Sequence, residues 1–477
     1  MDISEKRFRD PVHGYISIPE DICRDFIDTQ VFQRLRHIEQ TSMRVLYPSA
    51  RHDRFIHSLG TYHLGKRLFE YLHKNADDET KSRLARHKKT FHIACLMHDC
   101  GHAPFSHTCE RFYNYNRKTG SASEKPVYRR LKEVYAGASD FEADDSFNPK
   151  EHEAFSAIIL KVCYGDALNR CECDVELAAR MITGCTYPDE TEPDNQIKNI
   201  LIGLLNGSAI DVDKLDYILR DTWASGVQNT SVDIDRLLAA ARIHRGDNDR
   251  LTLCFHKSAL SVLQTVLNAR NYLYEWIYGD HTILYYAELL DRAVCKLAGK
   301  LSPSNPNDFW ETVFSETPFL RPQRLGEASF YLPNDGDLWF WLKHFKDDIE
   351  EVQEYLERMP RRLPLWKTMA EFRSLFPHLK NPKACDSVGK RIPHLFAERF
   401  DTDENNIIVT SGLFNPARFD EDGISILLKD ADFPISLTSV MGDPAPISPK
   451  HFFYVFVPRY LKDKKNEMIE LIKNQKR

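Results

Sequence analysis

The sequence predicts a mainly α-helical protein with a small α+β lobe at the C-terminal end. Helical periodicity dominates the first 300 of its 477 residues, linker-like residues follow Leu301, and short β-branched or aromatic runs appear towards the end. A chain of this length exceeds one compact core. We therefore predict a first domain at 1–300 with an insertion at 110–150, a helical extension at 301–380 and an α+β lobe at 381–477.

Each region has its own local pattern. FRDPVHGYISIP predicts an N-terminal hairpin that turns at His13 and Gly14. RKTGSASEK and ASDFEADDSFN are polar stretches around YRRLKEVYAG, as expected of an insertion. DLWFWLKHFKDDIEEVQEYLERM predicts two helices of the extension. NNIIVTSGLF, GISILLKD, PISLTSVM and HFFYVFVP predict a small sheet before a basic terminal helix.

Composition narrows the class of protein. The chain is 42% hydrophobic and 28% charged, the balance of a soluble globular protein. Its net charge of -6 has the wrong sign for a protein whose main ligand is long nucleic acid. No signal peptide or membrane-spanning run is visible, and the 11 cysteines form no C-x-x-C pair, which indicates reduced thiols. We expect a cytoplasmic protein.

Residues 91–107, FHIACLMHDCGHAPFSH, contain the strongest candidate for a site. A helix over residues 90–101 would place His98 and His102 on its buried face. Pro104 ends that helix, so His98, Asp99 and His102 would lie near its last turn, at the rim of a pocket. A single inward histidine is usually a hydrogen-bonded core residue, but this cluster of histidines and an aspartate favours a metal site.

Two other segments supply candidate partners. His57 shares a helical stripe with apolar residues and faces the core, with Arg54 one turn earlier. His52 and His63 lie off that stripe and are interpreted as surface or packing residues. In GSAIDVDKLDYILRD, one helical face carries polar groups: Asp213, Lys214, Tyr217 and Asp221. The alternative for this helix is a solvated surface with ion pairs one turn apart.

Taken together, these segments resemble the HD-domain phosphohydrolases, whose H…HD…D metal ligands correspond to His57, His98, Asp99 and Asp213. DPVHGYI, DTQVFQRLRHIEQ, RFIHSLG, MHDCGHAPFSH, IDVDKLDY and ARNYLYEWIY further resemble the deoxynucleoside triphosphate (dNTP) triphosphohydrolases. The resemblance is closest to the animal branch with a sterile alpha motif before the HD domain, a motif not seen in this sequence. It covers roughly residues 5–295. It implies an HD-domain helical core and a divalent zinc, iron, manganese or magnesium ion.

The resemblance also implies roles for other residues. His102, His152 and Glu153 would activate water or bind phosphate, and His107 would be the general acid. The implied substrate contacts comprise cations for the triphosphate and polar or aromatic groups for the sugar and base: Arg54, Lys214, Arg270, Gln40, Asp221, Tyr217, Tyr274 and Tyr278. Tyr278 would exclude a 2′-hydroxyl. The animal enzymes have histidine where this chain has Tyr274.

Part of a regulatory site of that branch is also present. Lys6, Asp28, Gln33 and Arg36 match residues that bind an activating GTP or dNTP between subunits. This match predicts nucleotide activation and a homo-oligomer, either a dimer or a tetramer. The alternative is that FIDTQVFQRLRHIEQ is only an amphipathic core helix.

The sequence therefore predicts an enzyme that hydrolyses dNTPs to deoxynucleoside and triphosphate, for control of the nucleotide pool or antiviral defence against phage. Two alternatives stay open. The protein could be an HD phosphohydrolase acting on another nucleotide or on nucleic-acid ends, or a nucleotide sensor without turnover. No membrane partner is expected.

Overall fold

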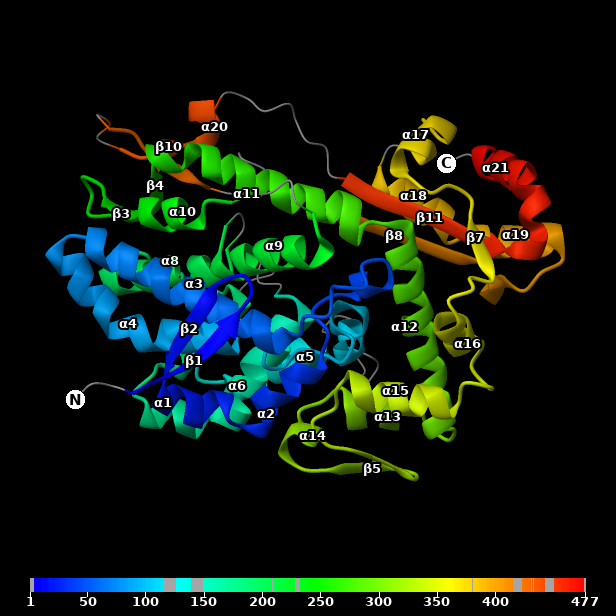
Figure 1. The fold of residues 1–477 in the computed structure, drawn as a ribbon, viewed down its shortest axis with the longest axis horizontal. Coiled ribbons are helices and arrows are strands. Elements are labelled where there is room, and N and C mark those ends of the chain that lie inside the picture. The colour runs from blue at the N-terminus through cyan, green and yellow to red at the C-terminus, as the bar shows by residue number, and fades with distance from the viewer. Residues whose placement is uncertain are drawn as a thin grey trace.

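A computed structural model describes residues 4–114, 126–138, 149–207, 210–227, 232–379, 381–414, 423–429, 431, 433–441 and 450–475. The fold is mainly α-helical with a few small sheets, which confirms the predicted class (Figure 1). Of the predicted insertion, RKTGSASEK and nearly all of ASDFEADDSFN lie outside the described residues. Between them, α5 (Pro126–Val134) is helical.

The N-terminal part is a bundle of helices. Its longer helices are α3 (Arg54–Asn75), α4 (Asp78–Met97), α6 (Glu151–Arg170), α7 (Val175–Thr183), α8 (Pro193–Leu205) and α9 (Val212–Ser225). Helix α3 packs on α4 and α9, and α4 packs on α7 and α8 (Figure 1). Aspartates at the N-caps of α3, α4, α7 and α9 accept a hydrogen bond from the backbone N–H three residues later. These caps fix where each helix begins, and so where the residues of its first turn point.

Shorter elements connect and cover the bundle. They are α1 (Glu20–Ile22), η1 (Cys23–Ile27), α2 (Gln30–Gln33), η2 (Arg34–His37), η3 (Ser42–Val45), η4 (Ser106–Thr108), η5 (Glu110–Asn114), α10 (Ile234–Ala240) and η7 (Lys257–Ala259). Residues 26–40 are therefore not the continuous amphipathic helix considered as an alternative. The predicted hairpin is confirmed as β1 (Glu5–Asp10) and β2 (Gly14–Pro19), with Asp10 paired to Gly14.

The long helix α12 (His281–Leu301) follows α11 (Leu260–Tyr272) and the π-helix η8 (Leu273–Tyr278). Beyond it are α13 (Asn307–Val313), α14 (Thr317–Leu320), β5 (Gln323–Leu325), β6 (Ala328–Phe330), α15 (Asp335–His344), α16 (Glu350–Glu357), β7 (Arg362–Pro364), α17 (Met369–Leu375), α18 (Pro382–Gly389), α19 (Ile392–Phe400) and η9 (Glu404–Asn406). Helix α12 stands between the N-terminal bundle and the C-terminal elements β7, β11 (Lys450–Pro458), α16 and α19 (Figure 1). The predicted helical pair of the extension corresponds to α15 and α16.

The C-terminal strands do not form the single sheet that their pattern predicted. β8 (Ile408–Phe414) and β11 (Lys450–Pro458) pair with β7 in the order β7-β11-β8. β9 (Ser425–Leu427) and β10 (Ile435–Ser436) instead extend the hairpin of β3 (Ala241–Arg245) and β4 (Leu251–His256), through parallel pairing of β9 with β4. PISLTSVM is mostly the helix α20 (Leu437–Met441). Period-two patterns predict strands but not partners, because pairing is decided by distant backbone edges.

Hydrophobic residues form two cores. The larger core runs from the N-terminal hairpin through the bundle and includes α13, α15 and α16. The smaller core lies around Trp366, Phe372 and Phe453, and η10 (Arg459–Lys464) and α21 (Lys465–Lys473) close it. The boundaries at residues 300 and 380 stay predictions.

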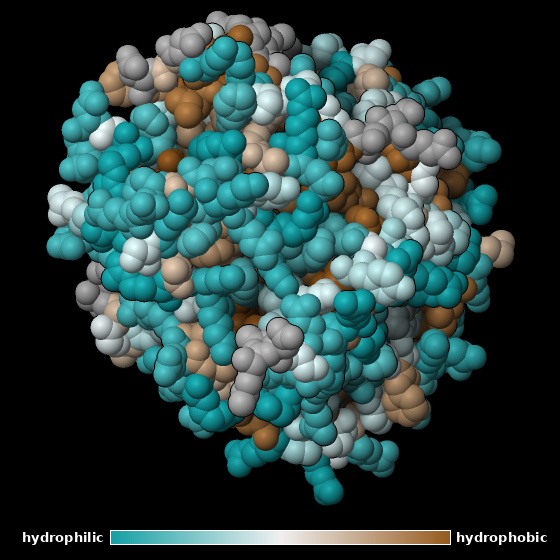
Figure 2. Space-filling view, turned by 60° about the vertical axis from the view of Figure 1, so that its left-hand side comes forward, coloured by the Kyte–Doolittle hydropathy of each residue, from teal (hydrophilic) through white to brown (hydrophobic). Residues whose placement is uncertain are grey.

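The face in Figure 2 is mostly hydrophilic, and hydrophobic residues appear there in small separate patches. All eleven cysteines are free thiols. Within the described residues, we find no helix with the length and apolar character needed to cross a bilayer.

Candidate metal and catalytic site

The four predicted metal ligands come together from helices α3 and α9 and from the residues that follow α4. His57 Nε2 lies 3.0 Å from Asp213 Oδ1, 3.7 Å from Asp99 Oδ2 and 3.2 Å from His98 Nε2. His98 Nε2 lies 3.6 Å from Asp99 Oδ2 and 3.7 Å from Asp213 Oδ1. Three of these side chains are almost fully buried, while that of Asp213 is 32% exposed. His57, His98 and Asp99 thus form the tightest group, with ligand atoms within 4.8 Å of one another, and the partly exposed Asp213 lies next to both imidazoles.

This donor set fits a divalent cation. Two imidazole nitrogens that face each other at 3.2 Å repel unless a proton or a metal ion lies between them. Burial would lower the pKa of His57, but the carboxylates of Asp213 and Asp216 outweigh it and raise that pKa to about 10. The cluster therefore attracts positive charge, which a proton or a cation can supply. Mixed imidazole and carboxylate ligands suit zinc, iron or manganese.

A buried network of acidic and basic side chains binds the second ring nitrogen of His57, Nδ1, and orients the ring. Asp216 Oδ2 lies 2.7 Å from His57 Nδ1, and its Oδ1 lies 2.6 Å from His13 Nε2. Arg220 donates two hydrogen bonds of 2.9 Å to Asp216 and one of 2.9 Å to Asp10. Asp10 in turn accepts the backbone N–H groups of residues 12 and 13. The DPVHG turn therefore fixes the orientation of a candidate ligand, a task that its sequence did not reveal.

The HD segment lies just after a helix rather than within one. Helix α4 ends at Met97, with His98 as its C-cap, whereas the periodicity suggested continuation to residue 101. The chain then turns, because Gly101 packs directly on α6: a Cβ atom there would lie 2.7 Å from the backbone nitrogen of Ser156. This close contact brings His102 next to His152, and their rings stack with centroids 4.5 Å apart.

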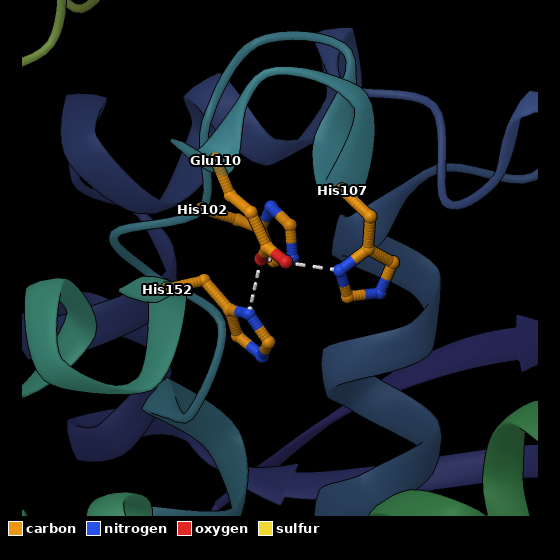
Figure 3. Close-up of side chains that lie close together, drawn as sticks. All are labelled: His102, His107, Glu110 and His152. Atoms are coloured by element: carbon orange, nitrogen blue, oxygen red, sulfur yellow. Dashed lines mark hydrogen bonds and ion pairs between the residues drawn. The ribbon is translucent and has the colours of Figure 1, made fainter. Parts of the chain in front are cut away.

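Four side chains form a second cluster next to the first, namely His102, His107, Glu110 and His152 (Figure 3). Glu110 Oε2 lies 2.6 Å from His152 Nδ1 and 3.2 Å from His107 Nδ1. Burial would raise the pKa of Glu110, but the two imidazoles outweigh it and hold that pKa well below its usual range. Glu110 is therefore a carboxylate that holds two histidines at once.

Sequence reasoning missed Glu110 and named Glu153, which was expected with His102 and His152 to activate water or bind phosphate. The Glu153 carboxylate accepts the backbone N–H of Lys150 at 2.8 Å and pairs with the Lys150 ammonium at 3.2 Å, as part of the cap of α6. The spacing of His107 and Glu110, one helical turn, was the signal that could have identified Glu110. His102 is fully buried, and neither ring nitrogen has a partner within the described residues. Burial and the Arg54 charge hold its pKa well below 6.5, so its ring is neutral.

Arg54 and Lys214, predicted to bind triphosphate, are both held by protein groups. Arg54 is buried and donates to Asp99 at 2.6 Å, to Ser106 Oγ at 2.9 Å and to the Gln40 carbonyl at 3.1 Å. Lys214 Nζ bonds to Asp211 and, at 2.7 Å, to the Gly207 carbonyl. Arg54 therefore stabilises a candidate metal ligand in this structure.

Asp221 is the centre of another buried group. His52 Nε2 lies 2.7 Å from Asp221 Oδ1, and the Tyr278 hydroxyl donates to Asp221 Oδ2. The interpretation of His52 as a surface or packing residue missed this contact, which joins positions 169 residues apart. Gln40 is buried, and its backbone N–H donates to the carbonyl of His52. The side-chain Oε1 atom of Gln40 has no hydrogen-bond partner in the described structure.

The predicted aromatic contacts follow one another along α11 and η8. The Arg270 guanidinium lies over the Tyr274 ring at 5.2 Å, and Tyr274 meets the Tyr278 ring edge to face at 5.2 Å. The segment after Tyr272 is a π-helix, so the regular α-helical spacing assumed from the sequence does not hold there. Tyr217 on α9 packs against the larger core.

The four residues predicted to bind an activator form two pairs. Lys6 Nζ lies 2.6 Å from Asp28 Oδ2, and Arg36 Nε donates to Gln33 Oε1 at 2.8 Å. Gln33 also donates to the Ile27 carbonyl, next to Asp28. A regulatory role for them stays a prediction.

Comparisons with known proteins agree on the N-terminal part. A family model described as HD domain matches residues 54–181. Over 279 residues the chain is 31% identical to deoxynucleoside triphosphate triphosphohydrolase SAMHD1 of Bos taurus, covering 57% of this chain and 44% of that protein. It is 29% identical over 278 residues to a homolog from Dictyostelium discoideum (58% and 46%) and 27% over 288 residues to the uncharacterized YwfO of Bacillus subtilis (60% and 54%). The chain spans about half the length of these relatives.

Two solved structures share the fold over nearly the whole chain. A hypothetical protein from Aquifex aeolicus has a TM-score of 0.65 at 21% identity and covers 98% of this chain and 100% of its own. A phosphohydrolase from Bacteroides thetaiotaomicron has a TM-score of 0.63 at 20% identity and covers 96% and 100%. At these identities, the likeness supports the fold alone.

Proposed function

We propose that the chain, whose residues 54–181 match the HD-domain family model, is a metal-dependent phosphohydrolase that converts dNTPs to deoxynucleoside and triphosphate. The observation that carries this proposal is the meeting of His57, His98, Asp99 and Asp213 around one volume. A divalent ion held there would polarise a phosphate oxygen and lower the pKa of a bound water. Asp213 is the one of these four side chains that is partly exposed, so a phosphate would approach from its side.

The histidine cluster supplies the proton transfers of the proposed reaction. Water attacks the α-phosphorus, and the bond from phosphorus to the 5′-oxygen breaks. Because Glu110 orients His152 through Nδ1, the Nε2 atom of His152 is free to take the proton of the water. His107 is bonded to Glu110 in the same way, and its side chain is 57% exposed, so its Nε2 can protonate the departing 5′-oxygen.

Selection of deoxyribose is assigned to Asp221 and Tyr278. Asp221 is held by His52 and Tyr278, so its carboxylate is fixed where it can accept a hydrogen bond from a 3′-hydroxyl. The Tyr278 ring next to it leaves a 2′-hydroxyl without room or partner. Arg270, whose guanidinium lies over the Tyr274 ring, is the cation assigned to the triphosphate.

Product analysis tests the reaction. Purified protein is incubated with each dNTP and NTP, with manganese or magnesium and with or without GTP, and the products are separated by ion-exchange chromatography. Triphosphate with deoxynucleoside is the expected result. Pyrophosphate or stepwise phosphate release would overturn the reaction and favour another phosphohydrolase, and nucleotide binding without turnover would favour a sensor. A GTP-dependent rate that Arg36→Ala abolishes would support the predicted activator site, and sedimentation with and without GTP tests the predicted homo-oligomer.

A further inference from the structure

A cavity lies beside the HD segment, on the side of α15 and α16. It encloses about 1060 Å³, and it is lined by one face of α15, by the segment around η3, by α16, and by Phe105 and Thr108. None of the residues assigned to metal, catalysis or substrate lines it. The cavity is large enough for a small organic ligand.

Aromatic rings form one wall of this cavity. The rings of Trp339 and Phe105 meet edge to face, with their centroids 5.5 Å apart. The centroids of the Trp339 and Tyr355 rings are 5.0 Å apart. Phe340, the neighbour of Trp339 on α15, is 65% exposed at the rim. Gly336 lies one turn before Trp339 on the same face and also lines the cavity. Such a wall suits a planar ring, which gains stacking energy against it.

Positive charge surrounds the open end. Lys343 continues the same face of α15, is exposed, and forms no ion pair within the described chain. Arg358 approaches from the end of α16, where its guanidinium lies 4.2 Å over the Tyr286 ring. Of the two acidic residues, Glu39 is paired with Arg44 and Asp335 is used by backbone N–H groups. Arg358 also donates to the Val45 carbonyl, but no carboxylate of the described residues pairs with Lys343 or Arg358, so an anion would find two cations without an acidic partner here.

We propose that this cavity binds a small aromatic anion of the nucleoside monophosphate class, with the base on Trp339 and Phe340 and the phosphate on Lys343 and Arg358. This binding is separate from the proposed hydrolysis and does not depend on it. Binding requires both the aromatic ring and the phosphate of the ligand, because the aromatic wall alone and the two cations alone each offer only a weak contact.

Residues that line the cavity are connected by hydrogen bonds to residues of the HD site, so a ligand in the cavity can affect that site. Asp335 Oδ1 accepts the Phe105 N–H at 2.6 Å, and its Oδ2 accepts the Glu39 N–H at 2.9 Å. The next residue, Ser106, accepts from Arg54 at 2.9 Å, and Arg54 donates to Asp99. A ligand against Phe105 therefore restrains the segment that carries Ser106 and His107.

Calorimetric titration tests the binding. AMP and GMP are titrated into the full chain, with adenosine as a ring without an anion and inorganic phosphate as an anion without a ring. We expect both monophosphates to bind and both controls to bind at least about tenfold more weakly. Phe340→Ala and Lys343→Glu change exposed side chains, so the fold tolerates them, and each should weaken AMP binding about tenfold. Lys346→Glu, the same charge change outside the cavity, should leave it unchanged.

Arg270→Ala separates this cavity from the proposed active site. AMP binding that survives Arg270→Ala but not Lys343→Glu supports the proposal, even if no dNTP is hydrolysed. Binding lost in Arg270→Ala and unaffected by Lys343→Glu, or no binding at all, would overturn it. Hydrogen–deuterium exchange tests the route: AMP should slow exchange of residues 103–109 in the wild type and not in Lys343→Glu, and unchanged exchange in the wild type would refute that route.

Discussion

Replacement of Gly60 by alanine should disrupt the buried pair of Asp216 and Arg220, which orients His57 in the candidate metal site. A Cβ atom at Gly60 would lie 1.9 Å from Asp216 Oδ1 and 2.5 Å from an Arg220 nitrogen, whereas an ordinary contact needs about 3.5 Å. Asp216 must therefore retreat by roughly 1.6 Å, which breaks its bonds to His57, His13 and Arg220. Loss of such a buried pair costs about 3–5 kcal/mol, and the better helix propensity of alanine offsets about 1 kcal/mol.

We thus expect Gly60→Ala to lower the free energy of unfolding by about 2–4 kcal/mol in urea titrations. Bound metal, measured by mass spectrometry after dialysis, should fall because His57 loses the partner that orients it, with affinity about 10–100-fold lower. Gly165→Ala is the matched control: Gly165 is in helix α6, and a Cβ atom there would meet nothing within 4 Å, so this variant should gain up to about 1 kcal/mol. A Gly60→Ala protein as stable and as metal-loaded as the wild type would refute the network.

Four further predictions concern the sites. Asp213→Ala should abolish hydrolysis while the circular dichroism spectrum stays unchanged; full activity would contradict its role as a ligand. Glu110→Gln should lower kcat about 10²–10⁴-fold with metal content unchanged, and lost metal would show that Glu110 is itself a ligand. Tyr274→His should change the ratios of kcat/KM among the four dNTPs, and unchanged ratios would remove it from the substrate pocket. Burial raises the pKa of Asp335 to about 7, so the folded state keeps a proton that the unfolded state releases above about pH 4. The stability of the wild type relative to Asp335→Asn should therefore fall as pH rises from about 4 to 7, and a constant difference in urea titrations would contradict this assignment.

The sequence predicted those features that depend only on residues close together in the chain. Helical spacing placed His57 on an inward face, and the succession of His98, Asp99 and Pro104 indicated the end of a helix. The hairpin at His13 and Gly14 was equally local. The helix boundary at Met97 and the π-helix after Tyr272 were not predicted, because packing against neighbouring elements decides where regular hydrogen bonding stops.

By itself, the sequence determined the helical class, the hairpin and the chemical types of the candidate ligands, because periodicity and residue chemistry act over a few neighbouring positions. The tertiary structure decided which carboxylate serves which histidine: Asp216 for His57, Glu110 for His107 and His152, and Asp221 for His52. These pairs join residues that are mostly far apart in the chain, and several carboxylates could have satisfied each ring. Burial selected among them, since a buried imidazole or carboxylate must find a partner within about 3 Å, and only the packed helices fix which one is there.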